Sequence, residues 1–156
     1  MLMVCIRSIS GVKVASKESL DCCYLTCAEA HASLSRGVRA KVGVVIVTRN
    51  GTILGGCNGL APGSSNELEY LDSEGNLVTK EETIHAELSA VLRAAREGVS
   101  VVGGTLYTTM SCCKPCSEMV AAAGISRVVY KETYRDTSGI ENLKNLGVMV
   151  EKFKED

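Results

Sequence analysis

The stretch Thr83-Ile84-His85-Ala86-Glu87 decides our interpretation of the fold. It places a soft-metal ligand and a carboxylate two residues apart, at the start of a segment rich in helix-forming residues. An apolar stripe continues from there and predicts a helix over residues 84–97. Thr83 can cap this helix through its hydroxyl. His85 and Glu87 then both lie in the first turn, where they can face one pocket.

A second group of metal-binding residue types follows in the run Cys112-Cys113-Lys114-Pro115-Cys116. The two-residue gap between Cys113 and Cys116 lets a pair of thiolates bind one zinc ion. With His85 they make three ligands and leave the fourth tetrahedral position open to water, as in catalytic zinc sites. Both motifs are expected at helix N-termini, which stabilise thiolates. The sequence therefore predicts one zinc ion per chain, held by His85, Cys113 and Cys116.

Glu87 is the expected catalytic residue of this site. Zinc lowers the pKa of a bound water to about 7, and a nearby carboxylate can carry the water's proton to an amidine-like ring. The alternative is that Glu87 is a fourth ligand, which would close the site and make it structural. Cys112 could also compete as a third thiol.

The composition fits one domain of 156 residues with an aliphatic core, because 46% of the residues are hydrophobic and there is no Trp. We expect residues 1–156 to form that domain, with residues 1–17 as an N-terminal arm. Four residues of the arm could form an edge strand: Val4, Ile6, Val12 and Val14. The net charge of −1 and the few aromatic residues argue against a polymeric nucleic acid as partner.

Eight cysteines are a high number for a chain of this length. The apolar start at residues 1–6 is too short for a signal-peptide core, and no apolar run reaches the length of a membrane span. We therefore expect a cytoplasmic protein without disulfides and without a membrane partner. Most of the other cysteines are expected to be buried as small hydrophobic residues: Cys5, Cys22, Cys23, Cys27 and Cys57.

The remaining pattern predicts alternating helices and strands. Apolar residues at helical spacing predict a first helix over residues 18–35, among them Leu20 and Leu34. An Asn50-Gly51 turn joins strands 41–48 and 53–57 into a hairpin, and a long polar loop is expected over residues 64–82.

Beyond the helix at 84–97, further elements are expected in the order strand, helix, strand, helix, strand: 105–110, 115–123, 127–131, 138–146 and 148–150. This order predicts an α/β fold, namely a three-layer α/β/α sandwich with a mixed sheet of about five strands.

Several short motifs go beyond H-x-E and C-x-x-C, which form the core of the zinc nucleobase deaminase signature. They are Lys41-Val42-Gly43, Gly56-Cys57-Asn58-Gly59, Pro62-Gly63, His85-Ala86-Glu87-Leu88, Gly104-Thr105-Leu106-Tyr107 and Val129-Tyr130-Lys131-Glu132-Thr133-Tyr134. Over residues 18–153 the chain resembles deoxycytidylate (dCMP) deaminases of the bacterial and phage type, within the zinc-dependent cytidine deaminase-like superfamily.

The resemblance implies hydrolytic deamination of dCMP to dUMP, which supplies thymidylate synthesis. It implies that Asn58 meets the sugar and phosphate, that Ser35 and Arg39 lie beside the nucleotide, and that Tyr134, with Arg135 next to it, reaches toward a phosphate. Ala86 is a further candidate for substrate binding. The resemblance also implies a homo-oligomer, a hexamer or a dimer, and possible regulation by dCTP and dTTP.

Each substrate contact has a plain alternative. Ser35 and Arg39 could be solvated loop residues, Tyr134 a core aromatic, and Asn58 a residue that serves only its turn.

The chain departs from the family pattern at three positions. Cys112 stands where Pro is usual, Cys57 replaces the Tyr of a G-Y-N-G turn, and Ser89 replaces a common Asn. The substrate could therefore be another cytosine compound: dCTP, deoxycytidine, a modified cytosine nucleotide, or the free base. A zinc-binding scaffold without activity is the third reading, against which the retention of Glu87 argues.

Overall fold

The central sheet contains a hairpin and a parallel group of strands. The structure, a computed structural model, describes residues 15–154. Strands β1 (Gly43–Val47) and β2 (Ile53–Cys57) form an antiparallel hairpin, and β5 (Thr105–Met110), β6 (Arg127–Glu132) and β7 (Met149–Lys152) run parallel to one another. β1 also pairs with β5, in antiparallel direction, and so joins the hairpin to the parallel strands. The strand order is β2-β1-β5-β6-β7. The predicted mixed sheet of five strands is confirmed.

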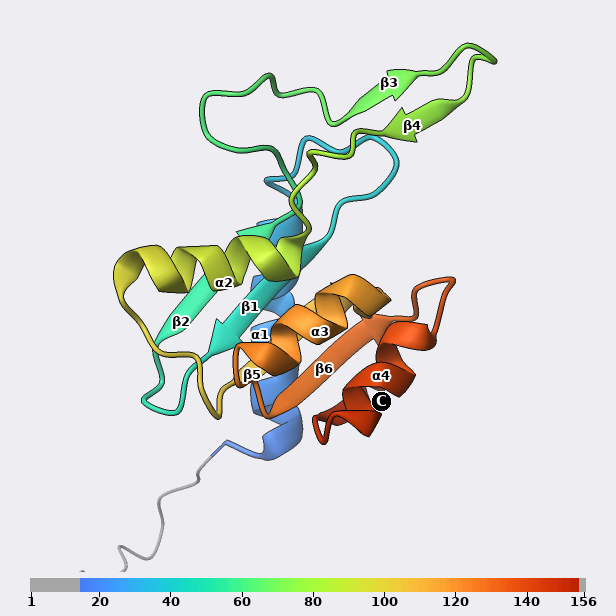
Figure 1. The fold of residues 1–156 in the computed structure, drawn as a ribbon. Coiled ribbons are helices and arrows are strands. Elements are labelled where there is room, and N and C mark those ends of the chain that lie inside the picture. Colours follow the sequence, from blue (N-terminus) through green and yellow to red (C-terminus); the bar gives the residue numbers. More distant parts are fainter. Residues whose placement is uncertain (1–14, 155–156) are drawn as a thin grey trace, which may run out of the picture.

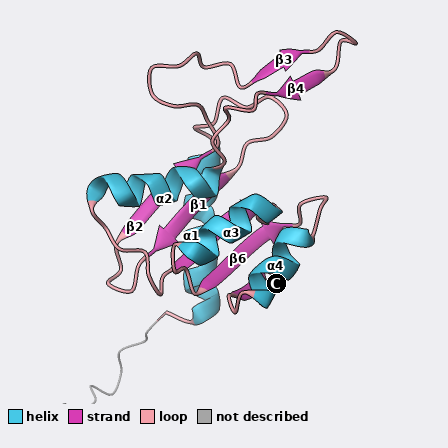
Figure 2. Cartoon of the chain, in the orientation of Figure 1, coloured by secondary structure: helices cyan, strands magenta, loops and turns pink. Residues whose placement is uncertain are grey.

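Helices cover both faces of this sheet (Figures 1 and 2). α2 (Ala86–Glu97), α3 (Lys114–Ala122) and α4 (Ser138–Asn145) lie in front of it in the view of Figure 1, and α1 (Lys17–Ala32) lies behind it. The larger core lies on the α2–α4 side, where Val44, Ile46 and Leu106 are fully buried. The predicted α/β/α layers are therefore present. None of the helices within residues 15–154 is long and apolar enough to cross a membrane.

Helix α1 buries a different face from the one that the apolar residues suggested. Its buried residues are Asp21, Leu25, Ala28 and Ala32. Leu20 and Leu34, two of the residues that marked the predicted helix, are exposed. The cause is a close approach to β1, since a Cβ on Gly43 would lie 1.9 Å from the carbonyl oxygen of Ala28. Small residues must therefore face the strand at this point.

The expectation that the remaining cysteines are buried is wrong for the four of them that the structure describes. Cys22 and Cys23 are exposed, and Cys27 and Cys57 are only half-buried. Cys5 and the proposed edge-strand residues of the arm lie outside the described residues.

A cluster of charged side chains joins α1 to strands β6 and β7. Arg127 donates to both oxygens of Asp21, at 2.8 and 2.5 Å, and to Glu151 at 2.7 Å, while the Tyr107 hydroxyl donates to Asp21 at 2.9 Å. Asp21 is only 5% exposed. Burial alone would raise its pKa, but the hydrogen bonds from Arg127 and Tyr107 and the charge of Arg127 outweigh this, and the pKa of Asp21 is lowered.

A short hairpin replaces the polar loop expected over residues 64–82. β3 (Glu69–Leu71) pairs antiparallel with β4 (Leu77–Thr79), and the pair projects from the sheet in Figure 1. Asp72 closes the turn by accepting hydrogen bonds from the backbone N–H groups of Glu74 and Asn76. The prediction of a loop was wrong because strands of three residues are too short to show an alternating pattern.

Candidate metal centre and substrate pocket

His85 lies at the N-terminus of α2. It occupies the cap position itself, with an extended backbone (φ −66°, ψ 155°) and no side-chain cap, so the prediction that Thr83 caps the helix is wrong. The segment before it is held in place because Ile84 and Gly59 exchange two backbone hydrogen bonds, of 2.7 and 3.0 Å. This bridge fixes the start of α2 beside the turn that follows β2.

Cys113 occupies the equivalent position in α3. It is also the cap residue, with an extended backbone (φ −72°, ψ 166°), and Pro115 lies in the first turn as predicted. Cys116 follows in the same turn and is buried. The N-termini of α2 and α3 therefore present one imidazole and two thiols to each other.

These three side chains form a group that can hold a metal ion. Their ligand atoms all lie within 4.8 Å of one another, and Nδ1 of His85 lies 3.5 Å from Sγ of Cys113 and 3.3 Å from Sγ of Cys116. A tetrahedral zinc ion with usual bond lengths would separate a nitrogen ligand from a sulfur ligand by about 3.6 Å. The geometry and the donor set thus fit zinc.

The electrostatics of the group favour a thiolate. Hydrogen bonds with Cys116 and then with His85 lower the pKa of the Cys113 thiol, and the hydrogen bond to Cys113 raises the pKa of His85. The pKa of Cys116 is raised, first by its bond to Cys113 and then by burial. Cys113 is therefore the thiol of the pair that loses its proton more readily. Its thiolate lies near the N-termini of α2 and α3, which stabilise a negative charge.

Glu87 lies in the first turn of α2 and is only 5% exposed. Burial raises the pKa of its carboxyl group. A raised pKa favours the protonated form of this carboxyl group, so that it can donate a proton as well as accept one beside the metal site. Cys112 is not part of the metal group that His85, Cys113 and Cys116 form; it is 1% exposed and belongs to the core cluster that also contains Ala86.

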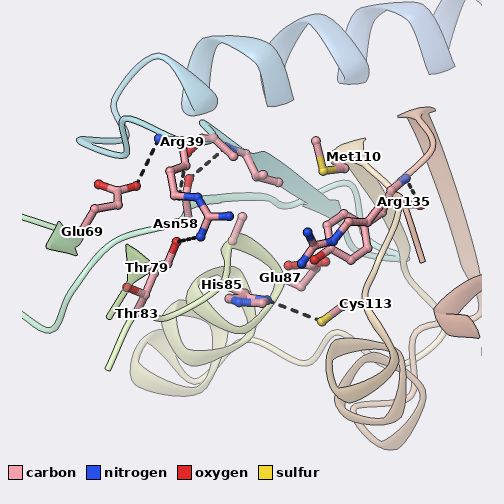
Figure 3. A pocket seen from close by; sticks show the side chains of 15 residues that line it. Arg39, Asn58, Glu69, Thr79, Thr83, His85, Glu87, Met110, Cys113 and Arg135 are labelled. Carbon is pink, nitrogen blue, oxygen red and sulfur yellow. Dashed lines mark hydrogen bonds between the residues drawn. The ribbon is translucent and has the colours of Figure 1, made fainter. Parts of the chain in front are cut away.

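A pocket of about 400 Å³ opens over the metal group (Figure 3). It is large enough for a small organic ligand. Its lining comes from several separate stretches of the chain: Arg39, Ala40 and Val42; Asn58; Glu69; Thr79, Thr83, His85, Ala86 and Glu87; Met110, Ser111 and Cys113; and Tyr134 and Arg135. Figure 3 shows Arg39 and Glu69 on one side of His85, and Arg135 on the other.

The hairpin β3–β4 contributes one wall of this pocket. The Glu69 carboxylate accepts hydrogen bonds from the backbone N–H groups of Val38 and Arg39, at 3.1 and 3.3 Å. Arg39 in turn donates from Nη1 to the Thr79 hydroxyl at 3.2 Å. These contacts hold the Arg39 guanidinium at the pocket.

Asn58 and Ser35 have different positions, although both were predicted to bind substrate. Asn58 lines the pocket, while its carboxamide accepts from the Val42 N–H at 2.9 Å and donates to the Ala40 carbonyl at 3.0 Å. Ser35 is buried behind it and is not part of the lining; its hydroxyl donates to the carbonyl of Asn58 at 2.9 Å. Ser35 therefore supports the turn rather than facing the pocket.

The opposite wall carries Tyr134 and Arg135. The Arg135 guanidinium lies 5.7 Å from the centre of the Tyr134 ring, and the Tyr134 N–H donates to the Ser111 hydroxyl at 2.8 Å. Ala86 also lines the pocket, next to Glu87. Of the predicted substrate residues, the structure thus brings Asn58, Arg39, Tyr134 and Ala86 together.

The sequence analysis missed several lining residues, chiefly Glu69, Thr79 and Met110. The first two belong to the unpredicted hairpin, and the only signal for them was the unusual length of the polar segment. Met110 is the last residue of β5, shortly before Cys113. The last residue of a strand that leads into a metal site can be expected to line the pocket over that site.

Comparisons with known proteins agree with this site. The family model for the cytidine and deoxycytidylate deaminase zinc-binding region matches residues 18–132. The deoxycytidylate deaminase of Mycobacterium phage D29 is 34% identical over 125 residues, which cover 74% of this chain and 96% of that protein. The deoxycytidylate deaminase of Enterobacteria phage T2 is 46% identical over 69 residues, 43% of this chain and 37% of that protein.

A solved structure shows the same fold. The dCMP deaminase of cyanophage S-TIM5, in complex with dCMP and dUMP, has a TM-score of 0.81 and 38% identity, covering 88% of this chain and 99% of that chain. Among the curated relatives, the match spans only 37% and 36% of the phage T2 and T4 proteins.

The fold and the His-Cys-Cys group beside a buried glutamate define a zinc-dependent deaminase domain. Within this class, the chain belongs to the deoxycytidylate deaminase family.

Proposed function

We propose that this protein catalyses the hydrolytic deamination of dCMP to dUMP and ammonia, using one zinc ion per chain. The observation that carries the proposal is the position of Glu87, a buried carboxyl group with a raised pKa, beside the three metal-binding side chains in the pocket. The cyanophage S-TIM5 relative, crystallised with dCMP and dUMP, supports the same substrate.

In this proposal His85, Cys113 and Cys116 hold the ion. Zinc, when bound, supplies Lewis-acid activation of a water molecule. Glu87 accepts a proton from that water as the oxygen bonds to C4 of the cytosine ring, and donates it to N3. Glu87 then accepts the remaining proton of the oxygen bonded to C4 and donates it to the amino nitrogen. The C4–N bond breaks, ammonia leaves, and the C4 carbonyl of uracil forms. The net reaction consumes one water and changes no oxidation state.

The pocket walls supply contacts for the rest of the nucleotide. Arg39 and Arg135 are the cationic groups of the lining, and guanidinium groups bind phosphate through charge-assisted hydrogen bonds. We assign the phosphate to this pair, with Tyr134 beside it. Asn58 keeps one amide proton for the sugar, and Ser35 acts only by holding the turn of Asn58. Ala86 gives a small side chain where the ring lies next to Glu87.

The assembly, regulation and location of the protein are further parts of the proposal. The exposed side chains of Tyr70, Leu71 and Leu77 in the hairpin support a homo-oligomer, hexamer or dimer. Another copy of the chain would bury this apolar surface. Light scattering measures the number of chains, and adding dCTP or dTTP to the assay tests regulation. The seven described cysteines are all free, which suits the reducing cytoplasm.

The experiment that tests the proposed reaction compares possible substrates in parallel. Zinc-loaded protein is incubated with dCMP, dCTP, deoxycytidine, CMP or cytosine, and ammonia release is measured. We expect dCMP to be turned over fastest. Equal turnover of deoxycytidine would remove the phosphate contacts from the proposal, and no turnover of any cytosine compound would refute deamination of this substrate class.

A further inference from the structure

The hairpin β3–β4 holds Arg39 through two residues that face each other across the hairpin. Glu69 of β3 pairs in register with Thr79 of β4. Residues directly opposite in an antiparallel pair place their side chains close together on one face. The Glu69 carboxylate accepts from the backbone N–H groups of Val38 and Arg39, at 3.1 and 3.3 Å. The Thr79 hydroxyl accepts from Nη1 of Arg39 at 3.2 Å (Figure 3). One cross-strand pair therefore holds both the backbone and the guanidinium of Arg39.

The segment that carries Arg39 has no regular structure of its own, since residues 33–42 contain no helix or strand. Asn58 holds the end of this segment nearest to β1, because its carboxamide accepts from the Val42 N–H at 2.9 Å and donates to the Ala40 carbonyl at 3.0 Å. The side chain of Arg39 itself has a partner only in the hairpin, among the contacts within the described residues. Its orientation therefore depends on the hairpin.

These contacts leave the positive charge of Arg39 available to a ligand. The partner of its guanidinium is a neutral hydroxyl, and within residues 15–154 Arg39 makes no ion pair with a carboxylate. Arg127 is the contrast, because its guanidinium pairs with both Asp21 and Glu151. A guanidinium has five N–H donors, and Thr79 occupies one of them. Arg39 can therefore bind a phosphate through two parallel hydrogen bonds while Thr79 keeps it oriented.

We propose that Glu69 and Thr79 are positioning residues for substrate selection: together they set the Arg39 guanidinium in the orientation that binds the phosphate of dCMP. This inference rests on the proposed function, in which Arg39 contacts the phosphate. It gives the hairpin β3–β4 a role in the preference for a nucleotide over a nucleoside. Neither residue belongs to the metal group, so the chemical step itself should not depend on them.

The first test measures kcat and KM for dCMP and for deoxycytidine in two variants of Thr79. Thr79→Val keeps a β-branched side chain of similar shape, which suits a strand, but has no hydroxyl. Loss of one hydrogen bond to a charged group is expected to lower kcat/KM for dCMP about tenfold. The loss should appear in KM rather than kcat, because the phosphate is bound equally before and during the reaction. The values for deoxycytidine should stay unchanged. Thr79→Ser keeps the acceptor and should stay within about threefold of the parent.

The second test asks whether the effect acts through Arg39. In an Arg39→Ala background, Thr79→Val should cause no further loss on dCMP, because the group that it positions is already absent. Glu69→Ala should lower kcat/KM for dCMP selectively, as Thr79→Val does. Glu69→Gln keeps a side-chain oxygen as acceptor and should stay within about threefold of the parent.

Three results would overturn the inference: full dCMP activity in Thr79→Val, equal losses on dCMP and deoxycytidine, or a further loss from Thr79→Val in the Arg39→Ala background. Melting temperatures identify a variant that does not fold. If Glu69→Ala is such a variant, the Thr79 series still decides the question, and if deoxycytidine is turned over too slowly to measure, the double variant decides it on dCMP alone. Failure of the unaltered protein to deaminate dCMP is a different result, which refutes the proposed function itself.

Discussion

Replacing Arg127 by Met tests the account of how α1 is attached to the sheet. The change leaves the Asp21 carboxylate, which is 5% exposed, with the Tyr107 hydroxyl and the exposed Lys17 ammonium at 3.6 Å, but without the guanidinium that contacts both of its oxygens. It also removes the contact of Arg127 with Glu151, which keeps its hydrogen bonds from Lys17. Removing one member of a buried ion pair costs about 3–5 kcal/mol, which is a large fraction of the 5–15 kcal/mol typical of a domain.

The assay is urea unfolding at neutral pH, with Arg96→Met as the matched control. Arg96 pairs with Glu97 on the surface, where both side chains are more than half exposed. Such a pair contributes about 0–1 kcal/mol. If Arg127→Met costs no more free energy of unfolding than Arg96→Met, the cluster does not have the role that we assign to it.

The same variant should change the response to acid. The pKa of Asp21 is lowered in the folded protein, so its contribution is present above the unfolded pKa of about 3.9 and is lost as the pH falls through the folded pKa. Without Arg127, the effect of burial on the pKa of Asp21 is opposed only by the Tyr107 bond and by the charge of the exposed Lys17, and the folded pKa rises. The stability difference between parent and variant should therefore narrow below about pH 4. A difference that widens on acidification would contradict the sign of this argument.

Three further predictions concern the pocket, the metal and the packing of α1. Arg39→Ala should lower kcat/KM for dCMP about tenfold to a hundredfold and leave deoxycytidine unaffected, because only dCMP has the phosphate; equal losses on both substrates would place Arg39 elsewhere. Removing zinc with a chelator should abolish turnover and lower the melting temperature, with both restored by added zinc, whereas Cys113→Ser should bind less zinc in metal analysis. Gly43→Ala should destabilise the fold by about 1–3 kcal/mol or more, because the new Cβ meets the backbone of α1 at 1.9 Å, while Gly59→Ala, which meets nothing within 4 Å, should have little effect on unfolding.

The sequence predicted the metal group well because its information is local. The one-residue gap between His85 and Glu87 and the two-residue gap between Cys113 and Cys116 are fixed in the sequence, and each motif lies at the start of a helix. The strand at Thr105–Met110 was also predicted at its observed bounds, since its β-branched and apolar residues lie between clear breaks.

The pocket walls could not be predicted in the same way, because they depend on contacts between distant segments. Arg39 is held by Glu69 and Thr79, which follow it by 30 and 40 residues in the chain. Ser35 looked like a residue of the pocket, yet its hydroxyl faces the carbonyl of Asn58. The buried position of Asp21 likewise depends on Arg127, 106 residues away, and a charged residue gives no sign of burial by itself.

The central claim is that Glu87 carries protons for a deamination at the metal group. The most direct measurement compares the parent with Glu87→Gln, recording dUMP formation from dCMP together with zinc per chain. The account predicts that Glu87→Gln keeps one zinc per chain and loses turnover by at least about a hundredfold, as expected for loss of a general acid and base. Turnover close to that of the parent, or loss of zinc together with activity, would contradict this role for Glu87.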